Sequence, residues 1–298
     1  MDLGKRKNYI GGTDCSKILG LSKYGTPLSV WAEKTGEIVP EDISGKLNVK
    51  LGTKLEQTVA ELFTEETGLK VVRANETKFH PKYDFLGANI DRKIVGQNVG
   101  LECKYFSAWR AKEFADNEAP ADAIFQCLHY LNVTGYDKWY LCALIGNENL
   151  IIKEFRKDDK LLESIEKKEV DFWNKYIVPK VAPTVIYKND SDILYQLYPN
   201  ANEELIDFDN SANDILDNLE SLKADKKNLE GLIEQQENTI KAMIKDNLGG
   251  KTDKHKFTWK NQISKRLDTK VLKENEPILY ERYLKEINTR VFRVGKLK

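Results

Sequence analysis

Apolar residues recur at two different spacings along this chain, and their order predicts a mixed α/β fold. Spacing typical of an amphipathic helix occupies residues 28–34, 48–67, 120–135 and 158–176. Short apolar runs typical of strands occupy residues 69–73, 77–80, 85–90, 99–105, 138–145 and 149–155. Gly68 and Gly135 follow two of the helices, as expected where a left-handed residue ends a helix. We therefore expect an α/β (α+β) core, a mixed central sheet flanked by helices, within residues 1–183.

The pattern changes after Pro183. The apolar residues of segment 184–210 follow no clear helical or strand spacing, and we interpret this segment as a linker or wrapping segment. Residues 211–248 predict one long helix, because their apolar positions come close to heptad spacing, with Lys226 and Gln236 as interruptions. We expect this helix to form an arm that packs against itself, a neighbour or the C-terminal segment.

Residues 249–298 are predicted to form a small basic module. They carry 14 basic and 6 acidic side chains, whereas residues 57–248 are net acidic and the whole chain has no net charge. Aromatic side chains are interleaved with these cations, which suits contact with DNA phosphates or with a partner. Strands are expected near 257–260 and 289–294, with a helix over 269–284. A solvated basic face that balances an acidic body is an equally open interpretation.

The composition excludes several classes of protein. No apolar run reaches the ~18–20 residues of a membrane span, and the first seven residues lack the apolar stretch of a signal peptide. A cytoplasmic protein without a membrane partner is therefore expected. The four cysteines stand singly, which argues against a disulfide framework, a zinc ribbon or an iron–sulfur cluster. A chain of 298 residues can form one large domain with an appendage.

The candidate chemistry lies on a predicted hairpin. Asp91 ends one apolar strand, and Glu102 and Lys104 lie two residues apart on the next. Because residues i and i+2 of a strand point to one face, Glu102 and Lys104 should project together, with Asp91 across the hairpin. Two carboxylates beside one lysine can hold a hard divalent cation and a water next to a phosphodiester. An E-x-K pair is also common on solvated strands, so the motif gains meaning only from its neighbours.

Two further motifs flank this hairpin. A Gly-x-x-Leu-Glu motif that ends at Glu56 lies on the preceding helix, and Gln126-x-x-x-Tyr130 lies on the following one. The order of the helix acid, the hairpin and the glutamine resembles the PD-(D/E)xK nuclease superfamily. Residues 10–22 and 31–36 are similar to the YqaJ-type viral recombinase family within the phage lambda-type alkaline exonucleases. The resemblance covers about residues 8–180, and the C-terminal segment more loosely.

The resemblance implies a restriction-endonuclease-like core with a metal site. Asp91 and Glu102 would bind a divalent cation, with the backbone carbonyl of Cys103 as a further ligand. Glu56 would be an additional acid that holds a ligated water or a second ion. Magnesium is the natural ion for carboxylate, carbonyl and water ligands, with manganese as a substitute.

The resemblance also assigns the remaining residues of the site. Lys104 would position and polarise the attacking water and stabilise charge on the phosphate. Gln126 would hydrogen-bond the nucleophile shell or hold Lys104 in place. Tyr130 lies four residues after Gln126 on the same helix face and would be a supporting residue of the site.

A 5′-phosphate site is expected near the N-terminus, where related exonucleases use an arginine and a hydroxyl residue. The candidates here are Arg6 or Lys7, together with Thr13 and Ser16 on a predicted helix start. Asn8 occupies the position where the family usually has its arginine. An ordinary capped helix is the competing interpretation of this stretch.

The function that this resemblance implies is a metal-dependent DNA exonuclease. It would degrade one strand of duplex DNA from the 5′ end and leave a 3′ overhang for a single-strand annealing protein. The family's best-known architecture, a ring-shaped trimer that encloses DNA, is a hypothesis for this chain. A restriction-type or structure-specific endonuclease on the same core is the alternative enzyme, and closed circular DNA separates the two. A non-catalytic DNA-binding recombination module is the alternative of another class.

Overall fold

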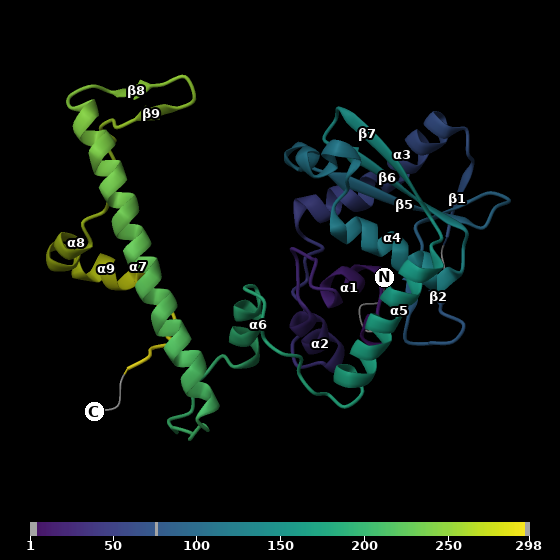
Figure 1. The fold of residues 1–298 in the computed structure, drawn as a ribbon, viewed down its shortest axis with the longest axis horizontal. Coiled ribbons are helices and arrows are strands. Elements are labelled where there is room, and N and C mark those ends of the chain that lie inside the picture. The colour runs from purple at the N-terminus through teal and green to yellow at the C-terminus, as the bar shows by residue number, and fades with distance from the viewer. Residues whose placement is uncertain (1–4, 75–76, 296–298) are drawn as a thin grey trace. The chain divides into compact units, whose positions relative to one another are not determined.

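The computed structural model describes residues 5–74 and 77–295. The chain divides into two compact units, Met1–Pro199 and Asn200–Lys298, and each is described by itself (Figure 1). Within the described residues, no helix combines the length and the apolar character needed to cross a membrane.

A five-stranded mixed sheet forms the centre of the first unit, in the order β1-β4-β5-β6-β7. Its strands are β1 (Val71–Arg73), β4 (Arg92–Ile94), β5 (Val99–Phe106), β6 (Lys138–Ile145) and β7 (Asn149–Arg156). Only β5 and β6 are parallel, and the other neighbours are antiparallel. A separate hairpin pairs β2 (Thr77–Phe79) with β3 (Gly87–Asn89). The predicted mixed sheet is confirmed, although β4 is an additional short strand that the apolar pattern did not indicate.

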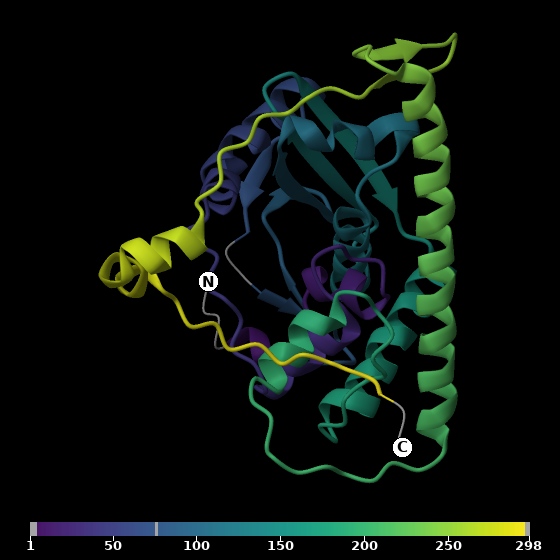
Figure 2. The same ribbon diagram turned by 90° about the vertical axis from the view of Figure 1, so that its left-hand side faces the viewer.

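Helices cover both faces of this sheet (Figures 1 and 2). The elements are η1 (Lys5–Asn8), α1 (Gly12–Ile18), α2 (Pro27–Thr35), α3 (Leu47–Thr67), η2 (Ala108–Asn117), α4 (Ala121–Thr134), α5 (Asp159–Phe172), η3 (Trp173–Ile177) and α6 (Asp190–Leu197). On one face, Val59 and Phe63 of α3 pack against Leu101 of β5. On the other, α4 and α5 contribute to a larger core with α1 and α2.

Alternation along β5 decides which side chains can meet. Val99, Leu101 and Cys103 belong to the core under α3. Because successive strand residues point to opposite faces, Glu102 and Lys104 point away from α3, toward the layer that contains α4. The candidate site therefore lies between the sheet and α4.

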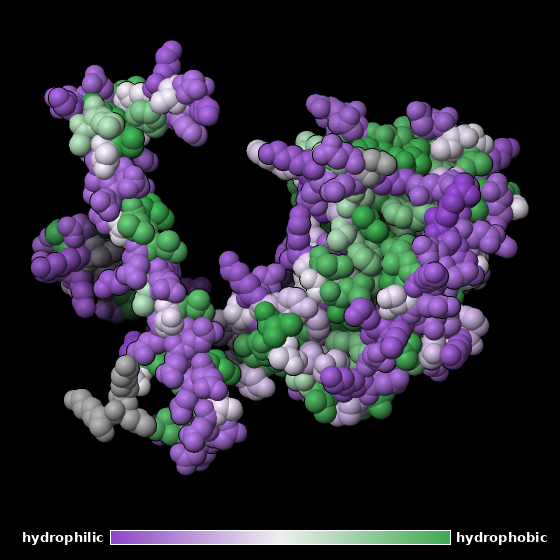
Figure 3. All heavy atoms as spheres, viewed as in Figure 1, coloured by the Kyte–Doolittle hydropathy of each residue, from purple (hydrophilic) through white to green (hydrophobic). Residues whose placement is uncertain are grey.

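The second unit consists of α7 (Ser211–Ile244), a hairpin of β8 (Gly249–Lys251) and β9 (Lys256–Thr258), and α8 (Thr269–Asn275) and α9 (Pro277–Tyr283). The predicted long helix is confirmed, and apolar side chains lie exposed along it (Figure 3). The single helix expected over 269–284 is wrong. It divides at Pro277, which cannot donate a backbone hydrogen bond and begins a new helix instead. The strand expected at 289–294 is also wrong, since no described strand pairs with this segment.

The first unit extends further along the chain than the sequence pattern indicated. Segment 184–199 was interpreted as part of a linker, but α6 lies in it and contacts α2. Ile193, Leu194 and Leu197 pack against the larger core. Their spacing places all three on one helix face, but a pattern of three residues is too short to be recognised in the sequence.

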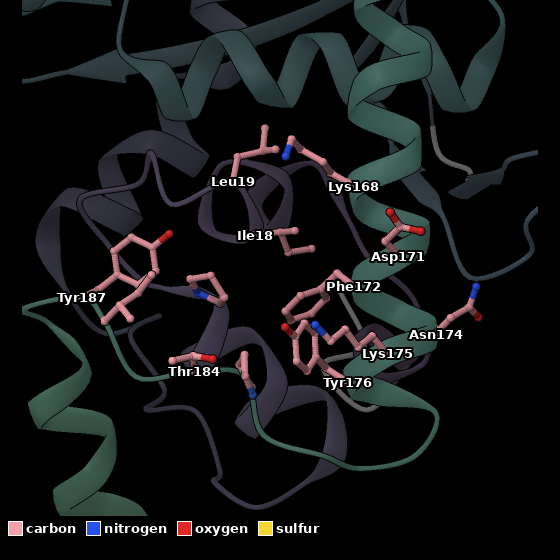
Figure 4. A pocket seen from close by; sticks show the side chains of 13 residues that line it. Ile18, Leu19, Lys168, Asp171, Phe172, Asn174, Lys175, Tyr176, Thr184 and Tyr187 are labelled. Atoms are coloured by element: carbon pink, nitrogen blue, oxygen red, sulfur yellow. The ribbon is translucent and has the colours of Figure 1, made fainter. Parts of the chain in front are cut away.

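An open cleft of about 760 Å³ lies where segment 183–187 passes α1 and α5 (Figure 4). Ile18, Phe172 and Tyr187 are among its lining residues. It shares no lining residue with the acids of the candidate site.

His129 of α4 is fully buried and tied to two elements. Its Nδ1 lies 2.7 Å from Oε1 of Glu169 on α5, and its Nε2 lies 3.0 Å from the carbonyl oxygen of Gly87 on β3. Burial alone would lower the pKa of His129, but the Glu169 carboxylate and these hydrogen bonds outweigh it and raise the pKa. The imidazolium thus joins three elements, as expected for a structural residue rather than a catalytic base.

The His129–Glu169 pair should make the stability of the fold depend on pH. A free imidazole titrates near pH ~6.5, so stability from the pair is fully present below that pH and is lost as pH rises through the higher folded pKa. We expect the free energy of unfolding in urea to fall as the pH rises above the ordinary imidazole range, and His129→Gln to lack that component. His255→Gln, at an exposed histidine, is the control. An unchanged pH dependence in His129→Gln would show that the pair does not couple to folding.

Candidate active site

The predicted hairpin brings Asp91, Glu102 and Lys104 together. Arg92, which follows Asp91, pairs with Leu101 in the β4–β5 ladder. The backbone N–H of Cys103 donates to Oδ2 of Asp91 at 3.1 Å. The Lys104 ammonium lies 2.5 Å from Oε1 of Glu102, as their shared face of β5 requires. The expected geometry of the hairpin is confirmed.

Gln126 and Tyr130 of α4 complete one side of the site. The Gln126 Nε2 group donates to Oε1 of Glu102 at 2.6 Å and to the Tyr130 hydroxyl at 3.0 Å. Gln126 therefore holds the acid Glu102 directly rather than Lys104. The backbone of α1 packs closely against this pair at Gly12. A Cβ at this position would lie 2.7 Å from side-chain atoms of both Gln126 and Tyr130, so only glycine fits without a shift. The sequence alone did not indicate that requirement.

Glu102 is the most constrained acid of the group. Its side chain is 1% exposed. Burial is the largest cause and the charge of Asp91 the second, and together they raise the pKa of Glu102 to about 8, although Lys104 opposes them. Burial and the nearby Glu56 likewise raise the pKa of Asp91, although Lys104 opposes them. Among the described residues, Oε2 of Glu102 is buried and has no hydrogen-bond partner.

These features fit a bound cation. Buried carboxylates that repel one another are stabilised by a positive ion, and an unpartnered buried oxygen otherwise costs about 1–3 kcal/mol. Carboxylate oxygens are the ligands that hard divalent ions prefer. Asp91 and Glu102 therefore suit a divalent cation, and the backbone N–H of Cys103 places that residue's peptide unit beside them.

Glu56 reaches the site from α3 but is held by arginines. Arg92 is buried, and its guanidinium donates to Oε1 of Glu56 at 2.6 Å, to Gln57 at 3.1 Å and to the Asp91 carbonyl at 2.9 Å. Arg73 lies 3.8 Å from the same Glu56 oxygen. Glu56 contributes negative charge to the site, as the pKa shifts of Asp91 and Glu102 show, while Arg92 fixes its position.

Lys104 carries a firmly held proton in this arrangement. Burial lowers the pKa of its ammonium, but the carboxylates of Glu102 and Asp91 outweigh burial and raise it. With the protein groups alone, Lys104 is therefore a cation. It can donate hydrogen bonds to a water or to a phosphate oxygen at the site.

The expected phosphate residues divide into two groups. The Arg6 guanidinium donates to the Thr13 hydroxyl at 3.0 Å. Burial raises the pKa of the Tyr130 hydroxyl, and the positive charge of Arg6 opposes that rise. Lys34 bonds the carbonyl of Arg6 at 2.8 Å and the carboxylate of Asp14 at 2.7 Å, which fixes η1 against α1. Arg6 and Thr13 thus lie together on the Tyr130 side of the site.

Ser16 and Lys7 do not join that pair. Ser16 is fully buried, and its hydroxyl donates to Asp122 of α4 at 2.8 Å, so its assignment to a phosphate site is wrong. The reason is the packing of α1 on α4, which turns this face of the helix inward. Lys7 is exposed, and its ammonium lies near Gly36 at the end of α2. Asn8, at the position where an arginine was expected, is exposed on η1.

Sequence comparisons show which known proteins this chain resembles. The model of the YqaJ-like viral recombinase domain matches residues 3–137. The Bacillus subtilis (strain 168) protein named "Uncharacterized protein YqaJ" is 37% identical over 297 residues, which is 98% of this chain and 93% of that protein.

Solved structures share the fold. An alkaline exonuclease from Laribacter hongkongensis superposes with a TM-score of 0.51 at 15% identity, over 60% of this chain and 92% of that one. A structure of the same protein in complex with dAMP gives a TM-score of 0.50 at 15% identity and the same coverage. The likeness confirms the predicted PD-(D/E)xK fold.

Proposed function

Because the chain belongs to the YqaJ-like viral recombinase family, we propose that it is a metal-dependent DNA exonuclease. One observation carries the proposal: Glu102 is buried between Lys104 and Gln126 beside Asp91, and one of its carboxylate oxygens lacks a partner among the described residues. A purely structural acid would cost stability in this position. An acid that binds a cation next to a phosphodiester explains the arrangement.

Magnesium is the proposed ion, with manganese as a substitute. Asp91, Glu102 and the Cys103 carbonyl would hold it, with Glu56 nearby. When bound, the ion would supply Lewis-acid stabilisation of the phosphate and favour ionisation of a water. The side chains do the rest. Lys104 orients the water and stabilises charge on the phosphate, while Gln126, held by Tyr130, fixes the orientation of the Glu102 carboxylate.

We further propose that the enzyme acts from the 5′ end of linear duplex DNA. The Arg6–Thr13 pair supports this direction, since a guanidinium and a hydroxyl on the Tyr130 side of the site can bind a terminal phosphate. The product would be a 3′ single-stranded overhang, which a single-strand annealing protein would take up in homologous recombination of the phage type. A ring-shaped trimer around the DNA is part of this proposal through the family resemblance.

Arg6→Ala tests the phosphate site. We expect its kcat/KM on a 5′-phosphorylated duplex to fall about tenfold, the scale of one lost charged hydrogen bond, while its activity on a 5′-hydroxyl duplex changes little. Lys7→Ala is the matched control, because it removes a neighbouring exposed cation. If Arg6→Ala lowered both activities equally, or if Lys7→Ala showed the selective loss instead, Arg6 would not be the phosphate ligand.

Direction is tested with linear duplexes labelled at the 5′ or the 3′ end of one strand. With magnesium present, the 5′ label is expected to appear first as mononucleotide, and the remaining strand should become sensitive to a single-strand-specific nuclease. Early release of the 3′ label would contradict the proposed direction and leave the metal site untouched.

A further inference from the structure

The long helix α7 presents an apolar stripe to solvent. It runs for 34 residues. Its exposed apolar residues include Ile215 (71% exposed), Leu222 (57%), Leu229 (59%), Ile233 (58%) and Met243 (70%). Figure 3 shows apolar atoms along this helix. A contiguous apolar stripe on a surface helix marks a face that another surface covers.

The stripe has a regular register. Apolar residues alternate at intervals of four and three, which is the seam of a coiled coil. The a positions are Leu219, Lys226, Ile233 and Ile240, and the d positions are Ile215, Leu222, Leu229, Gln236 and Met243. Only Lys226 and Gln236 are polar. The spacing of these two polar positions decides which partner fits.

We propose that the occupant is the same helix of a second copy of this chain, packed antiparallel, with Lys226 opposite the partner's Gln236. In an antiparallel pair, a positions face d positions. At this register the Lys226 ammonium can donate to the amide oxygen of Gln236, and symmetry repeats the contact. The other positions between 219 and 243 then pair apolar with apolar: Leu219 meets Met243, Leu222 meets Ile240, and Leu229 meets Ile233. Ile215 lies outside this overlap, because α7 ends at Ile244 and the position opposite Ile215 falls beyond that end.

Other arrangements match less well. A parallel pair places Lys226 against the partner's Lys226 and brings Asp225 near the partner's Glu230, so like charges meet twice. Sliding the antiparallel pair by one heptad in one direction sets Lys226 against Leu229, and in the other direction against Met243. Each slide leaves a lysine facing an apolar residue in the seam.

The flanking residues support the same register. At the e positions, Lys223 lies opposite the partner's Glu237, which gives two symmetric ion pairs. Glu230 faces its own copy across the two-fold axis, but Lys226 lies 3.6 Å from Glu230 within each helix and offsets that repulsion. At the g positions, Leu232, 57% exposed in the single chain, meets the partner's Leu232. This pairing does not depend on the metal site, and it is compatible with a ring-shaped trimer, in which the α7 helices would join two rings.

Light scattering of the full chain during size-exclusion chromatography tests the interface. Ile233→Glu adds a charge to the seam without disturbing the interior of one chain, and we expect it to halve the mass of the wild-type particle. Gln235→Glu adds the same charge on the outer face and should leave the mass unchanged. A wild-type mass of one chain, or a mass that Ile233→Glu does not alter, would overturn the proposal.

Cysteine cross-linking tests the register. A chain with both Leu222→Cys and Ile240→Cys should form a disulfide between two chains under mild oxidation, because these positions face each other only in the proposed pairing. Leu222→Cys alone should not cross-link. A cross-link in Leu222→Cys alone would show a parallel pair, and no cross-link in the double variant would contradict this register.

Discussion

Replacing Glu102 with glutamine is expected to lower magnesium-dependent DNA degradation on the order of 10³-fold or more, the scale on which loss of preorganised charge lowers turnover. Glutamine keeps the shape of the side chain and the oxygen that accepts from Gln126, but it removes the charge that would bind the cation. A steady-state assay with a linear duplex measures the loss.

Glu102→Gln also has a readout that does not need activity. A cation that binds only the folded wild type at about ten times its Kd adds roughly 1.4 kcal/mol, or about 3–6 °C in Tm. We expect Glu102→Gln to lose this shift. Glu154→Gln, at a partly exposed acid on β7, is the matched control and should keep both the activity and the shift. A full magnesium shift in Glu102→Gln would remove this acid from the metal site.

Lys104→Met should separate catalysis from metal binding. The ammonium contacts Glu102 at 2.5 Å and carries its proton, so its proposed work is to orient water and stabilise charge. Its loss should lower kcat by about 10²–10³-fold. The magnesium shift in Tm should persist, because Asp91 and Glu102 remain.

The control for Lys104→Met is Lys138→Met. Lys138 lies on the neighbouring strand β6 and forms a surface pair with Glu154 at 2.9 Å. Surface pairs contribute little, so kcat should stay close to that of the wild type. If Lys104→Met retained full turnover, the lysine would be a structural counter-ion of Glu102. If it also lost the magnesium shift, its role would include holding the metal ligands.

The hairpin shows what the sequence could predict. Strand residues alternate strictly, so the shared face of Glu102 and Lys104 follows from their spacing alone. Asp91 joins them because one short turn sets the register. Gln126 and Tyr130 also lie as their i, i+4 spacing on one helix indicated, although Gln126 contacts Glu102 and not Lys104.

Other parts of the site depend on packing between distant segments. Arg92 reads in sequence as an ordinary cation after an acid, and only the contact with Glu56, on α3, explains its burial. Ser16 was misassigned because the face of α1 that turns inward is set by Asp122, more than a hundred residues away. No local pattern encodes such contacts.

The proposed activity is hydrolysis of DNA from an end at this acid site. The most direct measurement compares a linear duplex with the same DNA as a covalently closed circle, each incubated with magnesium and with wild-type or Glu102→Gln protein. We expect the wild type to release nucleotides from the linear DNA only, and Glu102→Gln to release none. Cleavage of the closed circle by the wild type, or undiminished release by Glu102→Gln, would contradict the proposed activity.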